Sequence, residues 1–482
     1  MMGNMRHKIA AVFVTAFLCV AGAVSTGHAS TTVGGPQEGT TGYYDYTPHG
    51  MRTSTTETEI WCGDTSSHTV DTILEQQYTL SNWSLKVPER TAFQEGPAGS
   101  WDDTFTCNPS NVIQGNFVNV LGDGVTYNYV VYYIGYGSST KVNQIGAAYS
   151  VDGLNWHKYP TPVESYPTSS CGCYGYSQPN AVSIGGVISL YFEDNPNGTQ
   201  VFHDVAVSTD GAHFAPFTAV SNTGFSTLVK PNWGSLAYNP ANLQYYVLLG
   251  EGWRPPSQTG GVQEAGDNGC VIYTSSDPTL GNWTEIDTID TNLTGYEVNF
   301  LCGFVTDYNG NLSPDLQPSI KILTSASYPR PAYNASPTDL SNSAVFNNWQ
   351  IMWATYTPGN SWKPLQRVDY SPGHHEVTTG WYDSSVYHLE NINLGKLAEA
   401  PTGSATVPLY GCKFNLTNYF VSLDAGCEGQ YKLGVEGYLY STPAADRTAI
   451  YRCNIPGHDH FVSTDPNCEG QTTEFLLGYS QN

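Results

Sequence analysis

Six carboxylate side chains lie where the chain passes between a predicted strand and a loop. They are Asp102, Asp103, Glu193, Asp194, Glu251 and Glu297. Two carboxyl groups that face each other across a sugar ring can hydrolyse a glycosidic bond, because one protonates the leaving group while the other activates water or attacks directly. The required separation, ~5–10 Å, depends on the fold. The elements that carry these residues therefore decide which of them can act together.

Glu297 has the surroundings expected of a general acid. It opens a predicted strand beside Tyr296, Asn299 and Phe300, in the sequence YEVNF. Partial burial among such neighbours raises the pKa of a carboxyl group and keeps its proton available for a leaving group. The structural alternative is a carboxylate that only hydrogen-bonds to the adjacent strands.

Asp103 is the candidate base, and Glu193, in YFED, is a third candidate for catalysis. Each has a structural alternative: an Asp ahead of a Cys-Asn-Pro turn often caps that turn, and Glu193 can anchor a loop. Glu251, in GEGW, lies one place past a strand end and fits a sheet edge equally well. Asp152 and Asp210 stand in Asp-Gly pairs and are expected to form turns.

Four similar strand openings recur along the chain. They read TCNPSNVIQ, SQPNAVSIG, VKPNWGSLAY and YEVNFLCGFV, and a polar residue precedes Pro or Val in each: Asn108, Gln178, Lys230 and Glu297. Pro suits the first residue of a strand, where a missing N–H costs little. If these strands line a central channel, the polar residues converge at one mouth and can bind substrate.

Aromatic residues near the same mouth could stack on sugar faces. The candidates are Trp61, Tyr176 and Trp233. The alternative for each is a place in the packed core of a sheet, because buried sheets are also rich in aromatic residues.

Hairpins recur between the openings. Gln144–Lys158 alternates apolar residues, turns at Asp152-Gly153 and ends its return strand on Trp156. Val205–Phe214 and Val271–Trp283 repeat the pattern, and Ile73–Trp83 is a fainter copy. Asp-Gly supplies the positive φ of a two-residue hairpin turn. One copy per four-stranded sheet predicts a β-propeller, whose first blade starts at Thr58 and whose five blades fill residues 58–360.

The N-terminal segments are expected to lie outside the ring. Residues 1–29 combine Arg6 and Lys8, an apolar run and a small-residue cleavage site, which predicts a secretory signal peptide. Residues 30–57 follow as a loose Gly/Thr-rich lead-in. Ten cysteines remain after the signal is removed, and an even number in an exported chain predicts disulfides.

Charge and composition limit the partners. The formal net charge of −24 becomes −26 when Arg6 and Lys8 leave with the signal, and such a surface repels nucleic acid and anionic lipid. The 34 Tyr and 49 Gly residues favour an all-β fold. We expect an extracellular monomer that binds a poly- or oligosaccharide, does not insert into membranes, and has no metal site in its Cys and His residues. The sequence does not decide whether a Ca²⁺ ion binds in the propeller channel.

Residues 361–482 repeat internally. Cys412, Cys427 and Gly437 recur 41 positions later as Cys453, Cys468 and Gly478, together with the motif FVSxDxxCEG. A third copy without the Cys pair precedes them, which places repeats near 364–404, 408–445 and 449–482 and predicts a β-trefoil-like module. The expected disulfides are Cys412–Cys427 and Cys453–Cys468. His374, His375, His458 and His460 occupy equivalent positions of the repeats, so repeat symmetry explains them better than a metal cluster.

The predicted ring resembles the five-bladed propellers of glycoside hydrolase families 43, 62, 32 and 130, which share the SxDGxxW hairpin seen at 150–156. Members of those families commonly start an inner strand with Asp-Pro, the Asp being base or nucleophile. Asn108 stands at that position here, and an amide can do neither. The resemblance therefore implies that Asp102, Asp103 or a first-blade acid such as Asp64 or Asp71 has taken the role, or that the propeller only binds. The C-terminal repeats look like trefoil-like repeats appended to secreted bacterial proteins.

Together these features predict a secreted glycoside hydrolase with a carbohydrate- or wall-binding module. A non-catalytic carbohydrate-binding or adhesion propeller is the first alternative, favoured by Asn108 and the uncharged Gln178. A polysaccharide lyase with a base such as Lys230 is the second.

Overall fold

The computed structural model describes eighteen segments of the chain: residues 30–34, 45–63, 70–167, 172–196, 201–225, 232–250, 269–290, 296–316, 319–329, 350–357, 362–371, 374–380, 382, 387–390, 392–398, 406–415, 418–457 and 459–482. The regular elements in these segments are β-strands and two short 3-10 turns, so the all-β prediction is confirmed. No helix in the described part is long and apolar enough to cross a membrane. The predicted signal peptide lies outside the described residues.

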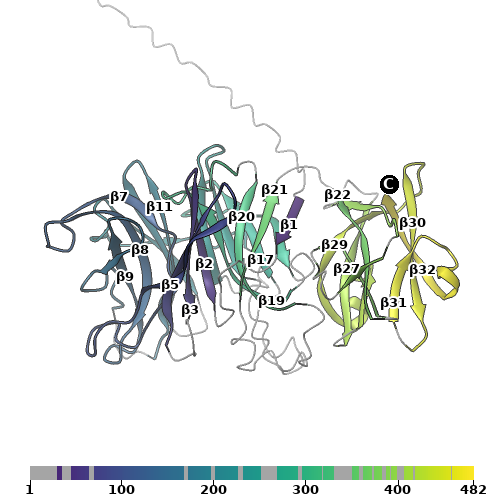
Figure 1. The fold of residues 1–482 in the computed structure, drawn as a ribbon, viewed down its shortest axis with the longest axis horizontal. Coiled ribbons are helices and arrows are strands. Elements are labelled where there is room, and N and C mark those ends of the chain that lie inside the picture. Colours follow the sequence, from purple (N-terminus) through teal and green to yellow (C-terminus); the bar gives the residue numbers. More distant parts are fainter. Residues whose placement is uncertain are drawn as a thin grey trace, which may run out of the picture.

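The described strands up to residue 357 form sheets of eight, nine and four strands. We divide these strands into successive antiparallel groups, which we call blades (Figure 1). Blade 1 consists of β2 (Tyr46–Arg52), β3 (Thr56–Gly63), β4 (Thr72–Thr79) and β5 (Ser84–Phe93). Blade 2 consists of an interrupted inner strand, β6 (Phe105–Cys107) and β7 (Ile113–Val118), with β8 (Thr126–Tyr136), β9 (Asn143–Ser150) and β10 (Trp156–Lys158). Blade 3 consists of β11 (Gly175–Ile184), β12 (Val187–Asn195), β13 (Phe202–Ser208) and β14 (Thr218–Val220).

Blades 4 and 5 follow the same plan. Blade 4 consists of β15 (Asn232–Asn239), β16 (Gln244–Gly250), β17 (Gly269–Ser275) and β18 (Thr284–Asp290). Blade 5 consists of β19 (Tyr296–Thr306), β20 (Ile320–Pro329), β21 (Gln350–Thr357) and, as its outer strand, β1 (Ser30–Gly34). The last blade is thus completed by the first strand of the chain.

The blades close into a ring through their inner strands. β19 packs on β15, β15 on β11, and β11 on β8 and β9, while β6 of blade 2 contacts β3 and β4 of blade 1. Between the last and first blades, β19 and β2 pair in parallel at Val305–Gly50 and Thr306–Met51. Apolar side chains from adjacent sheets pack together and form the cores between blades, as a propeller requires.

The Asp-Gly hairpin is present, but its loop spans residues 151–155 rather than the two residues predicted. β9 and β10 pair at Ser150–Trp156, and the Asp152 carboxylate accepts hydrogen bonds from the N–H groups of Leu154 and Asn155. Gly153 has a φ of 78°. These contacts make Asp152 a turn former, and the Asp210 carboxylate does the same for Ala212 and His213.

The described strands from residue 362 onward lie in the region predicted to hold three repeats, which we call the C-terminal module. Repeat 1 has β22 (Trp362–Pro364), β23 (Gln366–Ser371), β24 (His374–Thr378), β25 (His388–Leu389) and β26 (Lys396–Ala398); repeat 2 has β27 (Thr406–Asn415), β28 (Asn418–Ser422), η2 (Cys427–Gly429) and β29 (Tyr431–Tyr440); repeat 3 has β30 (Arg447–Ile455), β31 (Asp459–Ser463), η3 (Cys468–Gly470) and β32 (Thr472–Gln481).

The three repeats surround a common core. The last strands β26, β29 and β32 pair with one another, and the equivalent valines Val377, Val421 and Val462 share one buried cluster. The expected disulfides Cys412–Cys427 and Cys453–Cys468 are present. Two further disulfides, Cys62–Cys107 and Cys270–Cys302, join neighbouring blades. The β-trefoil itself stays a prediction.

Sequence reasoning misplaced the start of blade 1. It treated residues 30–57 as a loose lead-in and began the blade at Thr58, but the lead-in contains both β1 and the inner strand β2. Thr58 belongs to the second strand. The inner strand was missed because its sequence, YTPHGMR, lacks the apolar alternation that identified other strands.

Candidate functional site

Four inner strands share an unusual backbone conformation near their beginning. Thr47, Asn108, Gln178 and Leu301 have φ angles of 53°, 45°, 47° and 43°. Positive φ is uncommon for residues other than Gly and costs ~1–3 kcal/mol, so it persists only where the surroundings enforce it. In β2, β11 and β19 the residue lies at a β-bulge, and in blade 2 it lies in the break between β6 and β7. These bulges mark one end of the ring, which we call the entrance end.

This conformation corrects the alignment of the strand openings. Asn108 and Gln178 are equivalent, as predicted, but Leu301 rather than Glu297 matches them in β19, and Thr47 matches them in β2. Glu297 lies four positions earlier on β19, and its side chain is outside the described residues. Lys230 and Glu251 lie outside them entirely. Trp233 stands on β15 directly before a register shift, and its side chain is likewise not described.

The residues that follow these bulges fill the axis of the ring. His49 of blade 1 lies 3.3 Å from Ser235 Oγ of blade 4, although 186 positions separate them. Asn180 accepts a hydrogen bond from the Leu236 N–H, and Asn111 both donates to and accepts from the backbone of Ala181. Burial lowers the pKa of His49 to about 3, so this imidazole is neutral. These contacts join the inner strands of blades 1–4 through buried polar side chains.

Blade 1 contributes two acids at the entrance end. The half-buried Asp71 carboxylate accepts a hydrogen bond of 2.8 Å from the Tyr46 hydroxyl. It lies within 4.8 Å of the sulfur of Cys107, the residue before Asn108. The fully buried Asp45 carboxylate accepts a hydrogen bond of 2.9 Å from the Trp61 indole N–H. Although Cys62, Asp71 and Cys107 lie together, both cysteines are in a disulfide and cannot bind a metal ion.

Blade 3 contributes Glu193. Its carboxylate accepts a hydrogen bond of 2.7 Å from Ser177 Oγ and lies 3.8 Å from His203 Nε2. The other ring nitrogen of His203 is 2.8 Å from Asn222 Oδ1. Glu193 is buried, so these contacts fix the orientation of its carboxylate at the entrance end of β12.

Burial, followed by the charges of Asp194, Glu164 and Asp204, raises the pKa of the Tyr176 hydroxyl. Burial raises the pKa of Glu164 to about 7, and burial together with the Asp194 charge raises that of Asp204 to about 6. Burial also raises the pKa of Asp194, against the opposing hydrogen bond from Tyr166. A carboxyl group that keeps its proton near neutral pH can act as a general acid. Sequence reasoning missed Glu164 and Asp204 because no motif surrounds them.

Asp103 bonds to Gly99 and Ser138 rather than to the Cys-Asn-Pro turn that its structural alternative expected it to cap. Its exposed carboxylate accepts hydrogen bonds from the N–H groups of Ser138 and Gly99 and from the Ser138 hydroxyl. These bonds lower its pKa to about 2. Asp102 is buried and accepts hydrogen bonds from Lys158 and the Tyr133 hydroxyl. Both acids hold a loop in place, and a carboxylate of such low pKa is a weak base.

Trp61 and Tyr176 cannot stack on a sugar. Trp61 is fully buried, and Tyr176 packs edge-on against Phe192, Phe217 and Tyr166 with only 2% of its surface exposed. Both residues lie in the packed cores of their sheets, which is the structural alternative considered for them. Asn108 and Gln178 are also nearly buried, at 4% and 7% exposed, so they shape the entrance more than they contact a ligand.

Comparisons with known proteins add structural likenesses. No family model matches the chain, and no curated protein matches it. Similar solved structures include an α-L-arabinofuranosidase from Podospora anserina in complex with cellotriose, with 10% identity, a TM-score of 0.44, and coverage of 69% of this chain and 98% of that one.

A family 117 glycoside hydrolase of Zobellia galactanivorans is 11% identical over 69% of this chain and 92% of its own, with a TM-score of 0.45. The catalytic domain of a Coprinopsis cinerea GH62 α-L-arabinofuranosidase is 9% identical over 69% of this chain and 98% of its own, with a TM-score of 0.44. These structures come from the class of enzyme that the sequence resembles. At such identities and TM-scores below 0.5, they say nothing about activity.

Proposed function

We propose that the protein is a secreted glycoside hydrolase whose poly- or oligosaccharide substrate binds at the entrance end of the ring. The observation that supports this most directly is that carboxyl groups of separate blades lie at this end of their own sheets, Asp71 before β4 in blade 1 and Glu193 with Asp194 near the end of β12 in blade 3. Loops and strand ends from several blades make this end the natural place for a site. The C-terminal module would hold the enzyme to carbohydrate or cell wall.

Within this proposal Glu297 is the general acid and Asp71 is the facing base. Asp71 replaces Asp103 because the Asp103 carboxylate is occupied by Ser138 and Gly99 and has a pKa of only about 2. The Tyr46 hydroxyl hydrogen-bonds to Asp71 and would orient it toward the sugar. Glu193, buried and fixed by Ser177, would support the site from within blade 3 rather than contact the substrate.

The test is hydrolysis of a panel of plant, algal and microbial glycans by the purified protein. We expect product from at least one glycan, and we expect Glu297→Gln and Asp71→Asn to lower the rate by about 10²–10⁴-fold, as is usual for acid–base groups. Asp103→Asn is the matched control and should keep most of the activity. Absence of product from every glycan, with binding unchanged in Glu297→Gln, would contradict the proposal.

The alternative is a carbohydrate-binding propeller without catalysis. It is favoured by Asn108, an amide at the Asp-Pro position, and by the internal hydrogen bonds that occupy Asp102 and Asp103. Two measurements separate the functions. A binder would be retarded by a glycan in affinity electrophoresis and would not shorten that glycan. A hydrolase would release fragments whose size falls with time.

A further inference from the structure

A cavity of about 390 Å³ opens in repeat 1 of the C-terminal module. Its walls come from the chain around β23 and from the segment between β25 and β26, and Asn482 from the end of β32 closes one side. The volume lies within the roughly 300–1,000 Å³ typical of small-molecule sites. The backbone of the walls is fixed, since the Leu365 N–H donates to the Gly395 carbonyl and the Glu390 N–H to the Arg367 carbonyl.

The lining combines an aliphatic floor with neutral and charged polar groups. Leu365 and Leu394 are buried beneath the cavity, whereas Leu389 is 52% exposed at its edge. The polar members include Gln366, Glu390, Asn393 and Lys396. Glu390 and Lys396 give the lining one acidic and one basic side chain. An apolar surface beside carboxylate and amide groups suits a neutral polyhydroxyl compound, which offers C–H groups on one face and hydroxyl groups at its edge.

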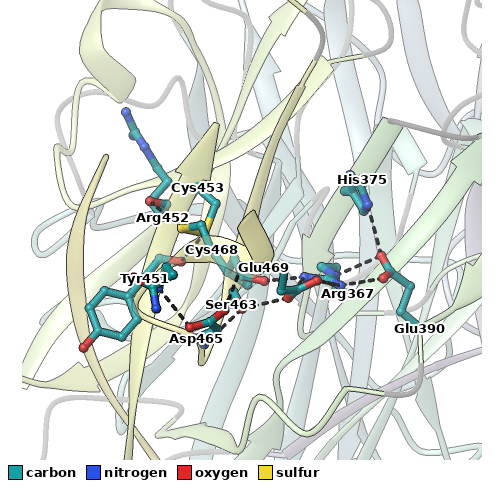
Figure 2. Close-up of polar contacts among 12 residues, drawn as sticks. Arg367, His375, Glu390, Tyr451, Arg452, Cys453, Ser463, Asp465, Cys468 and Glu469 are labelled. Atoms are coloured by element: carbon teal, nitrogen blue, oxygen red, sulfur yellow. Dashed lines mark hydrogen bonds and ion pairs between the residues drawn. A yellow bond between two sulfur atoms is a disulfide. The ribbon is translucent and has the colours of Figure 1, made fainter. Parts of the chain in front are cut away.

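Glu390 is held ready for such a ligand. Arg367 donates to both of its oxygens, at 2.9 and 2.6 Å, and His375 Nε2 lies 3.4 Å away (Figure 2). A carboxylate has about four lone-pair sites, so three contacts leave room for one more donor. Its side chain is 25% exposed, which allows a ligand hydroxyl to reach it. Preorganisation of this kind reduces the entropy lost on binding.

The support of Glu390 extends into repeat 3. Arg367 is only 3% exposed and also donates to Glu469, which the Ser463 hydroxyl holds from the other side (Figure 2). The same arrangement occurs without the cavity residues in repeat 3, where Glu474 contacts Arg452 and lies 3.6 Å from His460. Glu474 is 22% exposed, nearly the same as Glu390. It is therefore a matched control that tests the ion pair separately from the cavity.

We propose that the cavity of repeat 1 binds a saccharide, with Glu390 accepting a hydrogen bond from a sugar hydroxyl and the exposed Leu389 contacting a C–H face of the ring. The assignment rests on the proposed carbohydrate-binding role of the module and gives that role a site. The site is distinct from the entrance end of the ring, so binding here and hydrolysis there can be lost separately.

The test uses the full-length protein in affinity electrophoresis through gels that contain arabinoxylan, arabinan, β-glucan or mannan, and in pull-down with microcrystalline cellulose and chitin. The variants are Leu389→Asp and Glu390→Gln. Their controls in repeat 3 are Leu476→Asp, which is 40% exposed, and Glu474→Gln. We expect wild-type protein to be retained by at least one glycan, and both cavity variants to bind about tenfold more weakly. The repeat 3 controls should bind like wild type.

The assignment would be overturned by unchanged retention in both cavity variants, or by no retention of wild-type protein by any glycan. Equal losses in the Glu390 and Glu474 variants would overturn it as well, because they would show that only the ion pairs of the module matter. Cleavage of short soluble oligosaccharides is measured in parallel. It should be the same in Leu389→Asp and wild type, whereas Glu297→Gln should lose cleavage but keep retention, so failure of one proposal is distinguishable from failure of the other.

Discussion

Arg367 in repeat 1 donates hydrogen bonds of 2.9 and 3.2 Å to the two carboxylate oxygens of Glu469 in repeat 3, across 102 positions of sequence. The same link joins Arg452 of repeat 3 to Glu428 of repeat 2. At the third junction Gly411 stands where Arg would be expected. The Glu of the repeated CEG motif thus binds the neighbouring repeat, and the first and last repeats are held together by one of these pairs.

Replacing Arg367 should destabilise the module. The Arg367→Met variant leaves Glu390 and Glu469 without their bidentate partner, and breaking a fully buried pair costs ~3–5 kcal/mol. We expect about 2 kcal/mol, because Glu469 is 41% exposed and water partly compensates it. Urea unfolding followed by tryptophan fluorescence measures the loss. Arg447→Met is the control, since Arg447 is bonded only locally to Thr442 and stacks on Tyr440; an equal loss in both variants would argue against the link.

The Cys453–Cys468 disulfide should act together with Arg367. Cys468 and Glu469 have positive φ angles of 50° and 55°, a costly conformation that the disulfide and the Asp465 hydrogen bonds hold in place. Removal of a disulfide that closes a loop of 15 residues costs about 3 kcal/mol in the chain-entropy estimate. In a double-mutant cycle, Cys453→Ser/Cys468→Ser and Arg367→Met should lower the unfolding free energy by less than the sum of the separate losses. Strict additivity would show that the turn places Glu469 without the disulfide.

Local patterns and repeats made much of this fold predictable. The Asp152-Gly153 turn needs only residues close in sequence. The repeat of one Cys pair after 41 residues predicts both module disulfides from the sequence alone. The inner strands β2 and β19 could not be aligned correctly. Their bulges are enforced by packing around the ring axis, for example of Gly303 against the Pro48 carbonyl, so Thr47 and Leu301 can share a backbone conformation without a shared residue type.

The candidate site was harder to predict than the fold, because burial decides what each side chain can do. Trp61 has the type expected of a sugar platform, but it is buried beside Asp45. Asp103 has the type expected of a base, but Ser138 and Gly99 occupy it. Glu164 has no motif, and its raised pKa of about 7 arises from burial, which a single sequence does not reveal.

Stability should fall with rising pH because of Glu59. This fully buried carboxyl group beside Glu57 has a pKa raised to about 8, chiefly by burial, against an ordinary value of 4.5. Between pH 4.5 and 8 the unfolded chain releases this proton while the folded protein keeps it, so the folded state loses relative stability as pH rises through that window. Gln76 donates a hydrogen bond of 2.7 Å to the Glu59 carboxyl group, and the side-chain amide in Glu59→Gln can still accept that bond. Thermal unfolding from pH 5 to 8 should show a smaller fall in Tm for the variant; equal slopes would mean that Glu59 is ionised in the folded protein.

The stability of blade 5 should depend on the backbone of β1. This strand supplies the outer edge of blade 5 by pairing with β21, where Thr32 lies opposite Thr355 (Figure 1). Proline within a paired strand removes an N–H and distorts the backbone, at a cost of roughly 3 kcal/mol or more when the N–H is bonded. We therefore expect a Pro scan of residues 31–33 to alternate, with a large loss of Tm wherever the N–H faces β21 and a small one wherever it faces away. Thr32→Ala, which keeps its N–H, controls for loss of the side chain. A uniform, small effect of Pro at all three positions would show that blade 5 is stable without β1.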